Sequence, residues 1–339
     1  MSGTAAAAAD AGSLDLKPRF VPLSSDAIAA AAGPVPPALL ELAASSGSLV
    51  HDVQQMLFFA KSIVADEEGC TILWLQTRPK YGAPCTAVLG RQVVEGGARP
   101  QDLARRALRL LDPRPGAYTV RAPRNRADAA DDDGLMAVDM GTAALYATTN
   151  PRSPRSAAAD VAAEYGARVA DEARRLAAAV ASPKAAKGSP AEAPSRHRLD
   201  RMFLAAVQRE TAVHGRARWR TLDVDDKGAV GACMSLLDAA GVGAAWAVET
   251  RGGVHLLLEP AALGRGMRDL APQLALLRTR VVTAAGVEEE HEAVEVKTDC
   301  GCPLPGTMQG GFAVCFVDPA ALPRDAAAAD AIRERVAKA

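Results

Sequence analysis

A strand, a helix and a hairpin follow one another in the second half of the chain, and this order limits the possible folds more than any other feature. The predicted elements are, in order, a strand at Trp219–Val224, a helix at Gly228–Ala240 and two strands at Ala244–Glu249 and Val254–Leu258. The glycine-rich turn between the last two strands predicts a hairpin. Because a helix connects the first strand to this hairpin, we expect a βαββ unit in which the hairpin lies beside the first strand.

The first half of the chain predicts a mixed module of its own. Two strand patterns, Cys70–Thr77 and Cys85–Arg91, lie between stretches of helical apolar spacing. We therefore predict an α+β fold over residues 38–318. Within it we place an N-terminal α/β module at 38–139 and a second half at 140–318.

Composition sets the remaining segments apart. Residues 1–37 are rich in Ala, Pro and Ser and carry too little large apolar surface to offset the entropy of ordering, so we expect a flexible leader. Residues 182–195 (SPKAAKGSPAEAPS) have the composition of a linker, and we interpret them as a surface insertion. Residues 319–339 predict an alanine-rich C-terminal helix.

The chain of 339 residues carries 39 Lys and Arg against 40 Asp and Glu, which gives a net charge of −1. This balance excludes a protein that holds nucleic acid by bulk charge alone, so any such binding must be local. Two stretches, Arg196–Arg220 and Leu103–Arg126, each contain seven arginines. Such clusters suit phosphate contacts, and solvated helix faces are an equally consistent interpretation.

No stretch of the sequence approaches the roughly 20 uninterrupted apolar residues that span a bilayer, so we expect no membrane partner. Residues 1–16 have neither a basic n-region nor a leucine-rich h-region and do not predict a secretory signal. The six cysteines then indicate reduced thiols in an intracellular protein. These features do not distinguish the nucleus, the cytoplasm and an organelle.

Two aspartates alternate with apolar residues at the end of the first strand. In Leu222-Asp223-Val224-Asp225 the period of two directs both carboxylates to one face and both apolar side chains to the core. Neighbouring carboxylates repel each other, and a divalent cation such as Mg²⁺ or Mn²⁺ offsets that repulsion. The alternative interpretation is an acidic turn that follows a buried strand.

A histidine follows the hairpin glycines, 30 residues after Asp225. In a βαββ unit we expect the hairpin to aim His255 towards the two carboxylates. Gly252 and Gly253 lack Cβ atoms, so they permit positive φ in the turn and close approach of a phosphate to the backbone. The alternative is a tight hairpin with a partly satisfied histidine.

A third acidic side chain follows near the end of the domain. Glu295 stands between two valines, the pattern of an outward carboxylate on a strand whose other face is buried. A third carboxylate would complete a two-metal site of the kind used in phosphoryl transfer. Asp299 has the same parity, but it precedes Cys300-Gly301 and fits a solvated turn, so we prefer Glu295. An ordinary amphipathic strand is the alternative.

Together these motifs resemble a known superfamily. Asp-Val-Asp at a strand end, Thr-Arg-Gly-Gly-Val-His after the helix, and an acidic residue shortly before Leu304-Pro-Gly-Thr307 are similar to motifs I, II and III of the archaeo-eukaryotic primase superfamily, primase-polymerase type. Upstream, Leu145–Arg152 is similar to a hydrophobic strand ending in Asn-Pro-Arg found in some such domains. The resemblance covers residues 140 to 318.

The resemblance implies an RRM-like catalytic sheet and metal-dependent nucleotide transfer from nucleoside triphosphates. Its metal ligands, for Mg²⁺ or Mn²⁺, would be Asp223, Asp225 and Glu295. Its nucleotide-binding residues would be Arg251, Gly252, Gly253 and His255. It also implies nucleic acid as a partner, as a single-stranded template or a primer-template, and a helicase or another replication or repair protein.

One departure from the superfamily pattern supports a second hypothesis. Relatives commonly carry basic residues on either side of the Leu-Pro-Gly-Thr segment, whereas here Cys302-Pro303 precedes it and Met308-Gln309 follows it. A catalytically inactive nucleic-acid or nucleotide-binding protein on the same fold is therefore the alternative. A nicking endonuclease would need paired histidines, and Val254-His255-Leu256 contains one. The sequence leaves open DNA against RNA, primase against polymerase, and the oligomeric state.

Overall fold

The computed structural model describes residues 19–121, 135–181, 202–203, 205–207, 209, 212, 217–260, 266–282, 288–297 and 301–338. These residues form antiparallel sheets covered by helices, which confirms the α+β class predicted from the sequence. Two larger sheets organise the fold, and shorter two-stranded ribbons accompany them. The predicted insertion at 182–195 lies outside the described residues.

The first sheet has the strand order β12-β5-β1-β2 and is antiparallel throughout. Its strands are β1 (Cys70–Thr77), β2 (Ala87–Glu95), β5 (Ala143–Thr148) and β12 (Gly301–Pro303). One of its faces packs against helices of the N-terminal half. These helices are α1 (Ser25–Ala32), α2 (Pro37–Ser45), α3 (Val53–Ile63) and α4 (Pro100–Leu110).

The second sheet has the strand order β11-β6-β8-β7-β15 and is also antiparallel. Its strands are β6 (Arg220–Val224), β7 (Trp246–Glu249), β8 (Val254–Leu258), β11 (Val294–Lys297) and β15 (Cys315–Val317). The helices on its outer side are α7 (Val230–Ala239), α9 (Gly266–Leu274) and α10 (Ala326–Ala337). The predicted strand, helix and hairpin therefore all form, and the hairpin lies beside β6.

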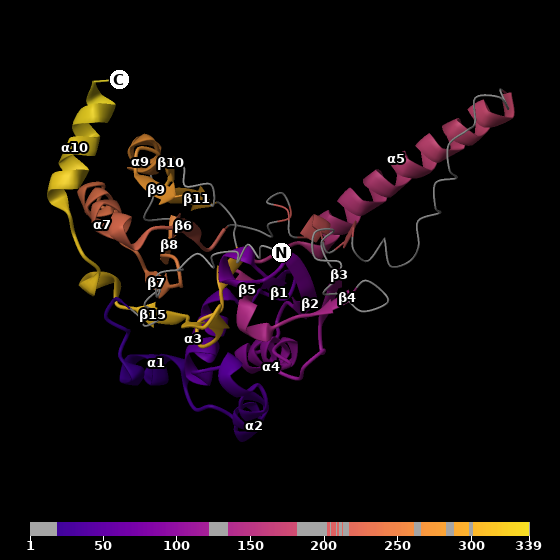
Figure 1. Cartoon of the computed structure of the whole chain (residues 1–339), viewed down its shortest axis with the longest axis horizontal. Helices are drawn as coiled ribbons and strands as arrows, with labels where there is room; N and C mark the ends of the chain where they lie inside the picture. Colours follow the sequence, from indigo (N-terminus) through magenta and orange to yellow (C-terminus); the bar gives the residue numbers. More distant parts are fainter. Residues whose placement is uncertain are drawn as a thin grey trace, which may run out of the picture.

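Shorter elements connect the two sheets along the chain. The ribbons pair β3 (Thr119–Arg121) with β4 (Leu135–Ala137), β9 (Arg278–Val282) with β10 (Glu288–Glu292), and β13 (Met308–Gln309) with β14 (Phe312–Ala313). Single 3₁₀ turns are η1 (Gly47–Leu49), η2 (Pro79–Tyr81), η4 (Met140–Thr142), η6 (Lys227–Ala229) and η7 (Pro319–Ala321). Helix α5 (Pro154–Ala181) extends away from both sheets (Figure 1). Among the described residues, no helix combines the length and apolarity needed to cross a bilayer.

Alternation along the strands divides the second sheet into two faces. Leu222 and Val224 of β6, together with Leu256 of β8, pack into the core beneath α7 and α9. The intervening residues project to the opposite face, where Leu257 and Val248 join the core around α3. The same face carries Asp223 and His255 towards its other end. Burial of one face thus determines where the polar side chains of these strands lie.

Helix α3 holds the two sheets together. Its N-terminus is capped by Asp52, whose Oδ1 accepts hydrogen bonds from the backbone of Gln54 at 2.8 Å and Gln55 at 3.2 Å. The ring of Phe58 meets Trp246 of β7 edge-on, with centroids 4.7 Å apart. It meets Phe316 of β15 at 4.9 Å. The helix therefore contributes to the cores of both sheets. In Figure 1, α3 lies beside β15.

The Asn-Pro-Arg segment forms a second connection between the sheets. Asn150, just after β5, accepts hydrogen bonds at Oδ1 from the backbone of Arg218 at 2.7 Å and Trp219 at 2.9 Å. Its Nδ2 donates to the carbonyl of Trp219 at 2.9 Å. All three bonds end on the backbone that leads into β6. Asn150 therefore positions the strand that carries Asp223.

The N-terminal segment differs from our expectation of a flexible leader up to residue 37. From Arg19 onwards the described chain packs on the domain, and Ser25–Ala32 is helical. Ile28 is 2% exposed against the core around α3, and the backbone amides of Arg19 and Phe20 donate to the buried carboxylate of Glu249. Burial of Ile28 and the hydrogen bonds to Glu249 therefore hold this segment on the domain, although its overall composition did not indicate such packing. Residues 1–18 lie outside the described residues.

The two sheets do not follow the two predicted halves in sequence order. Strand β5 lies after residue 140, yet it pairs with β1 of the first sheet. Strand β12 pairs with β5 although it follows β11 of the second sheet. The chain thus crosses between the sheets more than once. The predicted C-terminal helix forms over Ala326–Ala337.

Candidate catalytic site

Three of the site residues predicted from the sequence lie in one row across the second sheet. In the β11–β6 ladder Glu295 is opposite Asp223, and in the β6–β8 ladder Asp223 is opposite His255. Directly opposed residues of neighbouring strands project to the same face of a sheet. The row Glu295–Asp223–His255 therefore presents two carboxylates and an imidazole side by side.

Asp223 is at the centre of the contacts in this row. Its Oδ1 lies 3.2 Å from Nε2 of His255, and its Oδ2 accepts a hydrogen bond from Nζ of Lys297 at 2.6 Å. The same ammonium group lies 3.0 Å from Oε2 of Glu295. Asp223 and His255 are buried, whereas the Glu295 side chain is 60% exposed. The ammonium group of Lys297 therefore bridges the two carboxylates.

The pKa values in this cluster shift in opposite directions. Burial would raise the pKa of Asp223, but the charges of His255 and Lys297 hold that pKa below its usual range. Burial lowers the pKa of His255 in spite of the attraction of Asp223, which favours the neutral imidazole. Its Nδ1 is buried without a hydrogen-bond partner among the described residues. A buried polar atom of this kind is costly unless a ligand or a solvent molecule pairs with it.

Asp225 lies beyond the end of β6, where its backbone amide donates to the carbonyl of Ala293 at 2.9 Å. Partial desolvation of its carboxyl, together with the charge of Asp223, raises the pKa of Asp225. It lines an open cavity of about 530 Å³ with Lys80, Asp226, Thr279, His291 and Glu292. An open hollow thus lies directly beside the carboxylate row.

The η2 turn, which follows β1 of the first sheet, places Lys80 at this hollow and its neighbour Tyr81 against the hairpin. Burial lowers the pKa of Lys80, and the negative charge of Asp225 opposes that shift. The ring of Tyr81 lies 5.2 Å from the guanidinium of Arg251, which donates from Nη1 to the carbonyl of Gly310 at 2.9 Å. These contacts hold Arg251 in place. Sequence reasoning missed Lys80 and Tyr81, because no local pattern connects this turn with the second sheet.

The hairpin glycines have a different role from the one expected. Neither Gly252 nor Gly253 has positive φ, so the turn does not use the conformational freedom that glycine permits. A Cβ at Gly253 would lie 1.6 Å from the carbonyl oxygen of Val224. At the exposed Gly252 the nearest atom, the carbonyl oxygen of Asp225, would be 3.8 Å away. Gly253 is therefore required because the hairpin packs directly on the backbone of β6.

The carboxylates fit a divalent cation in their donor chemistry but not in their present arrangement. Carboxylate oxygens are the ligands that Mg²⁺ and Mn²⁺ prefer, and Asp223 and Glu295 converge on one cation. That cation is the ammonium of Lys297. Within the described ranges, no group of three or more His, Cys, Asp or Glu side chains is arranged to hold a metal ion. A divalent ion would therefore have to displace Lys297 from Asp223.

Lys297 itself was recognisable in the sequence. It follows Glu295 by two residues, so the period of a strand places both side chains on one face. Asp299, the alternative third acid, lies outside the described residues. The described arginines of the two clusters make mainly internal contacts: Arg105 pairs with Asp102 at 2.7 Å, and Arg218 donates to the carbonyl of Val64 at 2.6 Å.

Comparison of the chain with known protein families, with curated proteins and with solved structures found no match. No family is therefore assigned to this chain, and no activity is transferred from a relative. Its function has to be inferred from the placement of its own residues. The row Glu295–Asp223–His255, with Lys297 and Lys80 beside it, is the feature with the clearest chemical character.

Proposed function

We propose that this chain is a metal-dependent nucleotidyltransferase of the primase-polymerase type, which acts on nucleic acid with nucleoside triphosphates. The observation that carries the proposal is the row Glu295–Asp223–His255 on one face of the second sheet. Asp223 belongs to the Asp-Val-Asp motif, His255 to the Thr-Arg-Gly-Gly-Val-His motif, and Glu295 is the acidic residue before the Leu-Pro-Gly-Thr segment. One residue from each of the three sequence motifs therefore lies in the same row.

The topology of the second sheet supports an RRM-like interpretation. With β6, β7, β8 and β11 numbered 1 to 4 along the chain, the order across the sheet is 4-1-3-2. Helix α7 connects the first two of these strands and α9 lies before the last. This βαββαβ connectivity is that of the split βαβ fold, to which RRM sheets belong. Strand β15 and the β9–β10 ribbon are additions to it.

In this proposal Asp223, Asp225 and Glu295 would hold two metal ions, one to lower the pKa of a 3′-hydroxyl and the other to neutralise the leaving pyrophosphate. His255 takes up a proton when the triphosphate binds, so that Nδ1–H, on the ring atom without a protein partner among the described residues, donates to a phosphate oxygen. Its Nε2 remains beside Asp223, which fixes the orientation of the ring. Lys80 lies across the open hollow from the second sheet, and its ammonium attracts the triphosphate.

The absence of basic residues beside Leu304-Pro-Gly-Thr307 in the sequence is offset in space. Arg251 bonds to the carbonyl of Gly310, two residues beyond Met308, and its backbone amide donates to Oε1 of Gln309 at 3.0 Å. A guanidinium from the hairpin therefore lies next to this segment. Its positive charge supports binding of a phosphate there.

A second candidate function is a nucleotide- or nucleic-acid-binding protein without catalysis. The ion pairs of Lys297 with Asp223 and Glu295 favour it, because they neutralise the carboxylates without a metal. The same fold could then bind phosphates through Lys80 and the hairpin. The two candidates differ in a single property, which is turnover.

The deciding experiment is nucleotide incorporation on primed and unprimed templates, of DNA and of RNA, with Mg²⁺ or Mn²⁺. We expect metal-dependent product with the wild-type chain and none with Asp223→Asn or Asp225→Asn. Glu41→Gln, an exposed carboxylate on α2, is the matched control and should retain full activity. If the wild-type chain binds triphosphates but forms no product on any template, the binding protein is the correct assignment. Equal turnover of wild type and both Asp variants would exclude the proposed site.

A further inference from the structure

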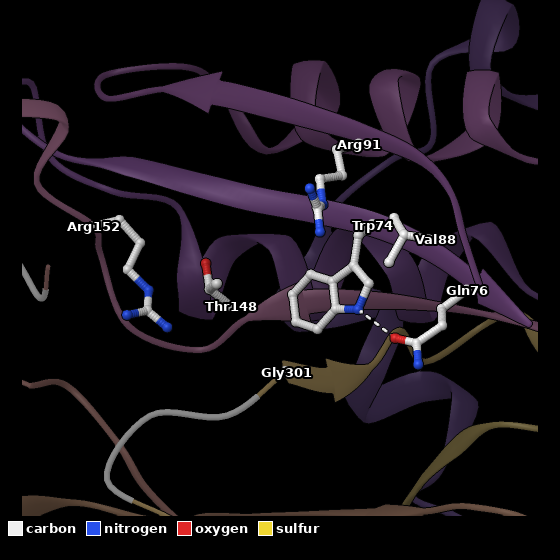
Figure 2. A pocket seen from close by; sticks show the side chains of 7 residues that line it. All are labelled: Trp74, Gln76, Val88, Arg91, Thr148, Arg152 and Gly301. Carbon is white, nitrogen blue, oxygen red and sulfur yellow. Dashed lines mark hydrogen bonds between the residues drawn. The ribbon is translucent and has the colours of Figure 1, made fainter. Parts of the chain in front are cut away.

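A second concave site lies on the first sheet, away from the carboxylate row. It is a cavity of about 290 Å³, and side chains of β1, β2 and β5 line it, together with Arg152 and Gly301. Figure 2 shows Trp74 in its middle, with Arg91 next to the indole and Arg152 on the far side of Thr148. An aromatic ring with one guanidinium group beside it, and a second beyond Thr148, is the central feature of this cavity.

Strand alternation explains why this face of the sheet is not part of the main core. Leu73 and Leu75 of β1 point to the side covered by α3 and α4. Trp74 and Gln76 point to the opposite side, where the indole Nε1 donates to Oε1 of Gln76 at 3.2 Å. Tyr146 of β5 stacks on the indole at 5.4 Å. The ring is thus held rigidly while its remaining surface lines the cavity.

Glycine at position 301 makes room for the indole. A Cβ there would lie 1.9 Å from Cη2 of Trp74, so any larger residue would collide with the ring. Gly301 does not have positive φ, and its backbone pairs with Thr148 in an ordinary ladder. Close approach to Trp74 is therefore the property that this position requires.

Two arginines line this cavity, and one of them, Arg91, is placed to hold an anion. Arg91 is opposite Trp74 in the β1–β2 ladder, and its Nε is buried without a hydrogen-bond partner among the described residues. Arg152 is 2% exposed and donates from Nη1 to the carbonyl of Arg209 at 2.6 Å. A buried guanidinium nitrogen without an acceptor is costly, so the Nε of Arg91 favours an anion in this cavity. No carboxylate side chain lines this cavity in the described part of the chain.

An aromatic path leads from the cavity to the carboxylate row. Tyr146, stacked on Trp74, packs in one cluster with Tyr81. Tyr81 lies beneath the guanidinium of Arg251, and its neighbour Lys80 lines the hollow beside Asp225. Tyr146 is 7% exposed and Tyr81 is 8% exposed, so both rings are buried, and of the three rings only Trp74 lines the cavity. Buried aromatic packing therefore connects the cavity to the candidate catalytic site, and the pairing of ring and cation that single strands use is present in the cavity as Trp74 with Arg91.

We propose that this cavity binds one nucleotide of a single nucleic-acid strand, with its base against Trp74 and its phosphate at Arg91. The volume of about 290 Å³ is at the small end of ligand sites, which span about 300–1,000 Å³, so it admits one nucleotide rather than several. The choice of a strand as the source of that nucleotide rests on the proposed function. The proposal that the cavity binds an aromatic ring and a phosphate is independent of the proposed function.

The test measures binding in the full chain without metal or triphosphate. The probes are single-stranded oligodeoxythymidylate, single-stranded oligouridylate and free uridine 5′-monophosphate. Arg91→Met keeps the aliphatic part of the side chain and removes its charge. We expect it to weaken binding of a single strand about tenfold, the effect of one charge-assisted contact. Arg109→Met, an exposed arginine on α4, is the matched control and should bind as the wild type does.

Trp74 supplies a second, local readout. Of the three tryptophans, Trp219 is buried and Trp246 packs between Phe58 and Phe316, so ligand binding in the cavity should change mainly the emission of Trp74. We expect quenching by the strand in the wild type and in Asp223→Asn, and none in Trp74→Phe. This persistence in Asp223→Asn separates the cavity from the proposed catalysis.

Three results would overturn the inference. Strand binding by Arg91→Met equal to that of wild type, in a variant with an unchanged circular dichroism spectrum, would exclude the arginine contact. If Arg91→Met does not fold, Arg91→Lys and Trp74→Phe must both weaken binding, and unchanged affinity in both excludes the site. Binding of the free monophosphate that depends on Arg91, with no binding of either strand, would show a free-nucleotide site and reject the strand.

Discussion

The ammonium group of Lys297 lies 2.6 Å from Oδ2 of Asp223 and 3.0 Å from Oε2 of Glu295, on the strand next to β6. A lysine therefore occupies the place between two carboxylates where a divalent cation would be expected. Its pair with Asp223 is largely buried, so the two charges attract each other more strongly than an exposed pair does. Whether this lysine competes with a metal is the central chemical question at this site.

Replacing Lys297 by methionine should increase the affinity of the chain for Mn²⁺. The substitution leaves two carboxylates facing each other without their cation, and a divalent ion then relieves their repulsion. We expect an increase of at least about tenfold, which equals about 1.4 kcal/mol. Titration of Mn²⁺ followed by electron paramagnetic resonance measures it, with Lys338→Met at the exposed C-terminal end as control. Unchanged Mn²⁺ affinity would argue for the binding protein.

Asp223→Asn and Asp225→Asn should change stability in opposite directions at neutral pH. The pKa of Asp223 is lowered in the folded chain, so its charged form stabilises the fold, and the substitution should cost about 1–3 kcal/mol. The pKa of Asp225 is raised, so removing its charge should be neutral or stabilising by up to about 0.5 kcal/mol. Urea unfolding of both variants without metal measures the difference. A large loss of stability in Asp225→Asn would contradict the assignment.

The same two substitutions should respond to pH in a defined way. The stability that Asp223 contributes is fully present above its unfolded pKa of about 3.9 and is lost as the pH falls through its lower folded pKa. The penalty from Asp225 is present above its raised folded pKa and disappears as the pH falls from there to below about 3.9. Both variants should therefore approach wild-type stability in acid. Differences from wild type that do not vary with pH would show that packing, not charge, is responsible.

Gly253→Ala and Gly252→Ala form a matched pair. At Gly253 the new methyl group would overlap the carbonyl of Val224, so the hairpin must move away from β6. We expect a loss of about 1–3 kcal/mol in the free energy of unfolding, together with displacement of His255. Gly252→Ala should change stability by less than about 0.5 kcal/mol, because its methyl group meets only ordinary contacts. Thermal unfolding of the two variants gives the comparison, and equal effects would reject the packing argument.

Asn150→Ala should disturb the start of β6 from a distance. It removes three hydrogen bonds to the backbone of Arg218 and Trp219, and two amides and a carbonyl lose their partner. The expected cost is about 2 kcal/mol or more, since buried unsatisfied groups carry their full desolvation penalty. Asn150→Asp retains the acceptor for the two amides and should lose less at neutral pH. Amide hydrogen exchange at Thr221 and Leu222 reports whether the strand itself is loosened.

Much of the second sheet was predictable from local patterns. The period of two around Asp223, the helix after it and the glycine hairpin define a βαββ unit, because each pattern concerns residues that are close in the sequence. The alternation of Glu295 with two valines placed its carboxylate on one face in the same way. The sequence also pointed to Gly253 as a position where the missing Cβ matters. The structure shows that a Cβ there would collide with the carbonyl of Val224, whereas φ is not positive.

The sequence by itself therefore determined which elements form and which side chains share a face, because those properties depend on spacing along one segment. Only the tertiary structure decided that β11 lies in register beside β6, that the turn after β1 brings Lys80 near Asp225, and that β12 returns to the first sheet. These contacts join segments far apart in the sequence. Their geometry follows from how the two sheets pack around α3 and are connected by Asn150, and no local pattern encodes that packing.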